Sequence, residues 1–281
     1  MVVGSVRRER AVMSARLALL LLGAAVMVVP FAYMLVTSFK PNALVLEVPP
    51  QFIPHHPTSA NYVQAWTSNK FEHYFFNSLT VAAVTTALSV LLSSMMAYAF
   101  ARFRFPGRRL LFGLLLIGLM VPTMMLIIPQ FLLAKHLHLL DSLSGLVFFY
   151  TGGTLALNTF LLRSFFQDIP RELEEAMVVD GAGPWKRYRR LIMPLSRPAL
   201  ATVAIFSFLA SWDEFVWALT IINDPDKRTL PIAIALFQGQ HSTSWGLVFA
   251  ASAIAVVPVI AIFIAFQRQF VSGITSGALK A

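Results

Sequence analysis

Two carboxylates stand in an otherwise apolar stretch and are well placed to act on a polar ligand. They are Asp213 and Glu214, and two hydroxyl residues, Ser207 and Ser211, precede them. Ser207, Ser211 and Glu214 follow the spacing i, i+4, i+7, which puts them on one face of a helix. Carboxylates in an apolar environment are costly. We therefore expect them either to line a path for a solute, accepting hydrogen bonds from its hydroxyl groups, or to bond another helix.

A second set of polar side chains lies some fifty residues earlier. Thr151, Thr154 and Asn158 are three and four residues apart and so share one helix face. Small polar residues at this spacing commonly form contacts between membrane helices, and they can also hydrogen-bond a passing solute. Both interpretations stay open for this stripe.

The sequence offers no constellation typical of catalysis. It contains no cysteine, no His-Glu-x-x-His zinc motif, no Gly-x-Ser-x-Gly nucleophile turn and no Gly-x-x-x-x-Gly-Lys-Ser/Thr phosphate loop. Adjacent carboxylates on one helix do not face each other. None of the six histidines stands at a metal-ligand spacing. We therefore expect no catalytic residue, no metal site and no cofactor bound by this chain, which would not be an enzyme.

The polar segment of residues 166–196 carries the signals of two short helices. Pro170 suits the start of the first helix, and the acidic residues after it are favourable near a helix N-terminus. Gly181 lies where this first piece ends, and Pro184 suits the start of a second, basic piece that we expect Pro194 to stop. Small residues at the bend would let a partner approach closely.

The composition places these segments in a membrane protein. Of 281 residues, 57% are hydrophobic and 12% are charged, whereas a soluble domain carries about 25% charged residues. Several apolar runs approach or reach the roughly 20 residues that a helix needs to cross a bilayer. We predict an all-α membrane protein, a single transmembrane domain over residues 1–281, with six spans near residues 16–37, 77–101, 109–134, 144–165, 197–222 and 246–267.

Prolines and aromatic residues add detail to this plan. Pro122 and Pro129 lie inside the third span and predict a bend there. The connection of residues 38–76 is proline-rich at its start. Its second half, from Asn61 to Phe76, is expected to contain a short helix on the membrane surface.

The positive charges predict the orientation. With both ends cytoplasmic, the inside segments hold seventeen lysines and arginines and the outside segments hold five. Because cytoplasmic loops carry the excess of positive charge, we predict an N-in, C-in protein whose 166–196 segment is cytoplasmic. The same bias explains the formal net charge of +9. We therefore expect membrane lipid as a partner of these charges, and no nucleic acid.

The 166–196 segment resembles the "EAA" loop of ABC-importer permeases. That loop reads Glu-Ala-Ala, three residues, Gly, nine residues, Ile-x-Leu-Pro, and this chain has Glu175-Ala176, Gly181 and Pro194 at the same spacing. It departs from the motif at three positions, each with an apolar replacement: Met177, Leu191 and Met193.

The resemblance extends over nearly the whole chain. The runs 77–79 and 97–102, at the two ends of the second expected span, are similar to this family. Residues 211–215 resemble the Trp-Asn/Asp-Glu-Phe signature of its carbohydrate-uptake branch, and residues 270–280 resemble that branch's C-terminal segment. The chain is thus similar to the smaller permease subunit of maltose-type transporters, which implies the type I ABC-importer bundle.

The resemblance also implies a division of labour among subunits in the bacterial cytoplasmic membrane. Two separate ATP-binding subunits would hold ATP and Mg, and one of them would receive the loop. A second permease, a different chain, would complete the pathway, and an extracytoplasmic solute-binding protein would deliver the solute. The residues expected to couple to the ATPase are Glu175, Ala176, Asp180, Gly181, Ala182 and Pro194.

The solute itself is less constrained than the transporter class. A sugar or a similar small polar solute is expected, and glycerol phosphate, a polyol or another non-sugar solute is the alternative. The apolar parts of the spans offer no basic residue to a phosphate, which favours a neutral solute. A secondary transporter is a further alternative, but it would typically show two similar halves, and no such repeat is present.

Overall fold

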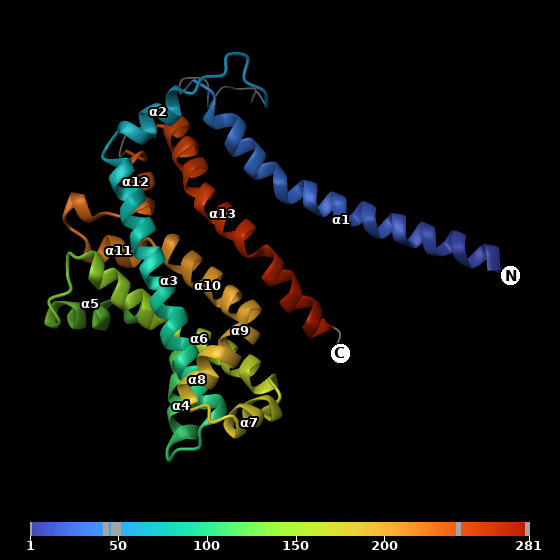
Figure 1. Cartoon of the computed structure of the whole chain (residues 1–281). Coiled ribbons are helices and arrows are strands. Elements are labelled where there is room, and N and C mark those ends of the chain that lie inside the picture. The colour runs from blue at the N-terminus through green and yellow to red at the C-terminus, as the bar shows by residue number, and fades with distance from the viewer. Residues whose placement is uncertain (1, 42–44, 46–51, 240–242, 279–281) are drawn as a thin grey trace. The chain divides into compact units, whose positions relative to one another are not determined.

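A computed structural model describes the backbone of residues 2–41, 45, 52–239 and 243–278. Within these residues the chain is helical apart from turns, with one isolated bridge between Gln238 and Thr243 (Figure 1). Short 3₁₀ and π turns join some of the helices. The α-helices are α1 (Val2–Ser38), α2 (Ala60–Thr67), α3 (Phe71–Arg102), α4 (Arg108–Ile117), α5 (Ile127–His136), α6 (Leu143–Asp168), α7 (Arg171–Val179), α8 (Pro184–Arg187), α9 (Met193–Leu195), α10 (Arg197–Trp212), α11 (Val216–Ile221), α12 (Leu230–Leu236) and α13 (Trp245–Ala278).

The chain divides into two compact units. The smaller comprises residues 1–69 and 234–254. In it, the Asn61 side chain of α2 donates hydrogen bonds to the Ser38 carbonyl at 2.8 Å and the Lys40 carbonyl at 2.7 Å. A Cβ on Gly246 of α13 would lie only 2.9 Å from the Asn61 amide nitrogen. Glycine at this position therefore lets α13 approach α2 closely. The expected short helix before the second span is present as α2.

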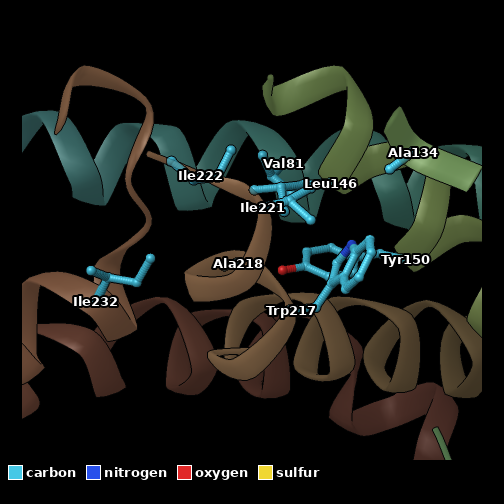
Figure 2. Close-up of a cluster of buried hydrophobic side chains, with 9 residues drawn as sticks. All are labelled: Val81, Ala134, Leu146, Tyr150, Trp217, Ala218, Ile221, Ile222 and Ile232. Carbon is cyan, nitrogen blue, oxygen red and sulfur yellow. The ribbon is translucent and has the colours of Figure 1, made fainter. Parts of the chain in front are cut away.

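The larger unit, residues 70–233 and 255–281, is built on α3, α6 and α10, which pack against one another. Small residues make this possible, because Ala82, Ser93 and Ala97 of α3 are buried with essentially no exposed surface. One apolar cluster gathers around Tyr150 and Trp217, where α6 meets α11 (Figure 2). A second lies toward the C-terminal ends of α3 and α6.

Among the described residues, four helices are long and apolar enough to cross a membrane, and two bent helix pairs bring the number of candidate spans to as many as six. The four are Val12–Ser38, Phe71–Arg102, Leu143–Asp168 and Trp245–Gln267. The expected all-α bundle is thus confirmed within the described residues. The helix of the second span begins at Phe71, six residues before the expected start at residue 77.

The third expected span is one of the bent pairs, as its prolines predict. Helical segments Arg108–Met120 and Thr123–His136 meet at 99°. The bend falls at Val121 and Pro122, both of which have extended ψ angles, since proline disfavours a helical conformation in the residue before it. Pro129 lies in the first turn of α5 and does not break the helix, because an N–H there has no intrahelical partner to lose.

The fifth expected span, near residues 197–222, is not one continuous helix in the structure. α10 ends at Trp212, and α11 begins only at Val216. The reason is the side chain between them: the carboxylate of Glu214 accepts the backbone N–H groups of Trp217 at 2.7 Å and Ala218 at 3.0 Å. A carboxylate in this position acts as a helix N-terminal cap, so a new helix starts here. The second bent pair lies just before it, where Pro184–Leu195 and Arg197–Trp212 meet at 80°.

Candidate functional site

The segment between α6 and α10 forms the two expected short helices, joined by a tight turn. Gly181, which follows the C-cap residue Asp180 of α7, has a left-handed backbone with φ of +72°. Its N–H donates to the Val178 carbonyl at 2.9 Å, and the Ala182 N–H donates to the Met177 carbonyl at 2.8 Å. These bonds form a Schellman motif, in which glycine is favoured because it has no Cβ to clash. The turn is therefore fixed by its own backbone.

The second piece starts as expected and ends slightly later. α8 has Pro184 in its first turn and continues through a π-helical turn, Tyr188–Ile192, into α9. Pro194 does not stop the helix, which ends one residue later at Leu195. Pro194 is the second residue of α9, directly after the π-helical turn.

Glu174 in the first turn of α7 holds this segment to the rest of the larger unit. Its side chain is 7% exposed and pairs with Arg102 at the end of α3, which is equally buried. Arg187 of α8 lies 3.7 Å from the same carboxylate. The Tyr98 hydroxyl of α3 is 3.5 Å from that carboxylate and 3.4 Å from the Pro184 carbonyl. One buried carboxylate thus joins α3, α7 and α8.

Sequence reasoning missed this ion-pair cluster. It counted Arg102 among the positive charges expected on the cytoplasmic side. It explained Glu174 only by the favourable interaction of an acidic residue with the N-terminus of its own helix. Arg102 also donates at 2.7 Å to the carbonyl of Ile169, just before α7. The only signal in the sequence was the family-like run of residues 97–102, which marked this end of α3 without naming a contact.

Most of the residues expected to couple to a partner lie on the outer surface of this segment. Ala182 is buried, and the other five are exposed: Glu175, Ala176, Asp180, Gly181 and Pro194. Large apolar side chains are exposed beside them, since Val179 is 87% and Trp185 59% exposed. Exposed apolar residues gathered on one surface are typical of a protein interface.

The two polar stripes meet inside the larger unit. The Asn158 side chain of α6 donates to the Ser207 hydroxyl of α10 at 2.8 Å, and the Ser211 hydroxyl donates to the Ser207 carbonyl at 2.8 Å. All three residues are at most 5% exposed. Hydrogen bonds of this kind are typical of contacts between membrane helices.

Thr154 and Glu214 face a cavity of about 360 Å³. The Tyr150 hydroxyl, also at this cavity, donates to the Glu214 carboxylate at 2.6 Å. Gln130 of α5 and Trp217 of α11 also line this cavity. A few polar groups among aromatic walls are the usual composition of a small-molecule site.

The other two residues of the stripes lie apart from this cavity. Thr151 is buried, and its hydroxyl oxygen has no hydrogen-bond partner among the described residues. Asp213 is exposed at the C-terminal end of α10. In the part of the chain that the structure describes, no group of three or more His, Cys, Asp or Glu side chains is arranged to hold a metal ion.

Comparison with known proteins gives consistent matches over most of the chain. Residues 89–276 match the family described as binding-protein-dependent transport system inner membrane component. A diacetylchitobiose uptake system permease protein of Streptomyces coelicolor is 36% identical over 94% of this chain and 87% of its own length. A trehalose/maltose transport system permease protein of Thermococcus litoralis is 38% identical over 93% of this chain and 96% of its own length. A sulfoquinovosyl glycerol transport system permease protein of Agrobacterium fabrum is 38% identical, covering 89% and 88%.

A solved structure shows the same fold. A chain in the crystal structure of a bacterial ABC transporter that imports the acidic polysaccharide alginate superposes with a TM-score of 0.80. The match has 23% sequence identity and covers 94% of this chain and 98% of the other. The helical bundle is therefore that of a type I ABC-importer permease.

Proposed function

Since the chain belongs to the family of binding-protein-dependent transport system inner membrane components, we propose that it is one of two permease subunits of an ATP-driven sugar importer. It would form part of the translocation pathway and pass movement from separate ATP-binding subunits to that pathway. It would carry no ATPase site or other catalytic site, and ATP and Mg would bind to the partner subunits.

The observation that carries this proposal is the surface formed by α7, the Gly181 turn and α8. Four of the six expected coupling residues, Glu175, Ala176, Asp180 and Gly181, are exposed there beside Val179 and Trp185. The buried pair of Glu174 and Arg102 ties the base of this surface to α3. A force applied to the surface by a docked ATPase subunit would therefore move α3 with it, instead of bending a loose loop.

The cavity beside Glu214 supports a neutral, hydroxyl-rich cargo. Its lining includes a carboxylate, two threonines, an amide and three aromatic residues, and none of the described residues that line it is a lysine or arginine. A phosphate-bearing solute would favour basic residues. The sugar-related names of two relatives agree with a hydroxyl-rich cargo. We propose that Thr154 and Glu214 line the pathway with Asp213 and Thr151, and that Asn158, Ser207 and Ser211 hold its wall together.

The remaining partners and the orientation follow from the charge bias and the family. We propose an N-in, C-in chain in the bacterial cytoplasmic membrane, with the α7–α8 surface facing the ATPase. A second, different permease chain, two ATP-binding subunits and an extracytoplasmic solute-binding protein would complete the importer. A chain like this one is also present in a crystal structure of the alginate transporter bound to a periplasmic protein that carries an alginate pentasaccharide.

Uptake measured in the native host tests the proposal. Deletion of the gene for this chain should abolish energy-dependent uptake of one of a panel of labelled di- and oligosaccharides, and the intact gene should restore it. Uptake of glycerol 3-phosphate and of a polyol serves as the control and should stay unchanged. Selective loss of glycerol 3-phosphate uptake would contradict the sugar assignment and leave the importer assignment standing.

A further inference from the structure

A cavity with four arginines lies at the junction of α3, α4 and α6. Its volume is about 770 Å³, and Arg104, Arg108, Arg109 and Arg163 are among the residues that line it. None of the described residues that line it is acidic. Several like charges around one cavity repel each other, and an anion in the cavity relieves this repulsion.

The contacts of these arginines leave their charges uncompensated. Arg104 and Arg109 make no ion pair or hydrogen bond within the described residues. The other two meet only neutral partners. Arg108 donates to the Phe103 carbonyl at 3.1 Å, and Arg163 donates to the Phe100 carbonyl at 3.4 Å.

The start of α4 adds to the positive potential. α4 begins after Gly107, and no side chain caps its first turn. The free N–H groups of a helix N-terminus carry a partial positive charge and favour an anion. The guanidinium of Arg163 also stacks 4.2 Å from the centre of the Phe112 ring, which fixes it at the side of the cavity.

The cavity continues directly into an apolar helix face. Leu110, Leu114 and Ile117 follow the spacing i, i+4, i+7 on α4 and are 67%, 54% and 55% exposed. α4 belongs to one of the candidate membrane spans, so this exposed apolar face is suited to take up acyl chains. We propose that the cavity binds the phosphate headgroup of an anionic phospholipid, whose acyl chains run along α4. A basic pocket at the end of a membrane helix is a recurring site for such headgroups.

Native mass spectrometry of the delipidated importer, titrated with phosphatidylglycerol, tests this site. Arg104→Gln combined with Arg109→Gln removes two charges that have no other partner. Arg16→Gln combined with Arg197→Gln is the matched control, since both control arginines are exposed and lie outside the cavity. The first pair should weaken binding of the tightest phosphatidylglycerol by about 30-fold at low ionic strength, since each arginine near an anionic surface contributes about fivefold. The control pair should leave it within about twofold.

Two further measurements distinguish an anionic phospholipid from other ligands of the cavity. Phosphatidylcholine should bind the native importer far more weakly than phosphatidylglycerol, and inorganic phosphate at millimolar concentration should not displace the lipid. Displacement by inorganic phosphate would make the cavity a soluble-anion site and overturn the proposal. Equal lipid binding by the two variant pairs would also overturn it, whether or not the ATPase subunits remain attached. Lipid binding at this cavity requires only that the chain lies in a membrane. The outcome of this experiment is therefore independent of whether the transported solute is a sugar.

Discussion

Glu174 and Glu175 are neighbours with opposite environments. Glu174 is buried against Arg102 and Arg187, whereas Glu175 is exposed on the α7–α8 surface. A buried ion pair resists separation, because removing one partner leaves the other charge without compensation in an apolar interior. Glu174 should therefore stabilise the fold, and Glu175 should contact the ATP-binding subunit.

Glu174→Gln should lower the free energy of unfolding by about 3 kcal/mol, because it leaves Arg102 unpaired. Glu175→Gln, the matched control, should leave stability within about 0.5 kcal/mol and lower transport-coupled ATP hydrolysis instead. Thermal unfolding of the purified importer and its ATPase rate measure the two effects. Equal stability of the two variants would contradict the structural role given to Glu174.

The carboxylate of Glu214 has two tasks that substitution can separate. Glu214→Ala removes the cap of α11 and the bond to Tyr150, and should cost about 2 kcal/mol of stability. Glu214→Gln keeps one acceptor oxygen and should cost about half as much. If Glu214 lines the pathway, the Gln variant should assemble normally yet take up the solute about tenfold more slowly, consistent with the loss of one charged hydrogen bond. Full uptake by an assembled Gln variant would contradict the pathway role of Glu214 and support only its role as the cap of α11.

At the scale of elements, the apolar runs and prolines of the sequence predicted most of what the structure contains. The bend at Pro122 follows from proline chemistry, and the division into α7 and α8 follows from the residues around Gly181. The break after Trp212 could not be predicted in this way, because no proline or glycine marks residues 213–215. It depends on where the Glu214 side chain turns once the helices have packed. The pairing of Glu174 with Arg102 is hidden for the same reason, since it joins segments far apart in the chain.

The Gly181 turn allows the docking surface to be blocked without disturbing the fold. A Cβ added at Gly181 meets no other atom within 4 Å, and asparagine tolerates the left-handed backbone. Gly181→Asn should therefore leave the unfolding temperature nearly unchanged while reducing ATPase binding and uptake.

Gly107→Asn is the matched control for the Gly181 substitution. Gly107 has a similar φ of +78° and equally open surroundings, and it lies in a different turn. This variant should keep the native coupling between ATP hydrolysis and uptake. Normal uptake by Gly181→Asn would exclude the turn from the contact with the ATPase.

At the scale of the whole molecule, the orientation rests on seventeen positive charges against five. The absence of cysteine from the sequence makes it directly testable, because single introduced cysteines give no background from this chain. Cysteine at Lys186 should react with a membrane-impermeant maleimide only in inverted vesicles, and cysteine at His56 only in intact cells. Both sites are exposed. The reverse pattern would overturn the orientation, and with it the placement of the α7–α8 surface toward the ATPase.

We expect this chain to work only together with a separate ATPase subunit. Affinity purification of the tagged chain in mild detergent from its native host, with mass spectrometry of the attached chains and an ATP hydrolysis assay, tests this claim most directly. We predict recovery of an ATP-binding subunit and a second permease, with hydrolysis that Gly181→Asn reduces. Recovery of the native chain alone, with no ATPase attached and no hydrolysis, would contradict the account and favour a secondary transporter.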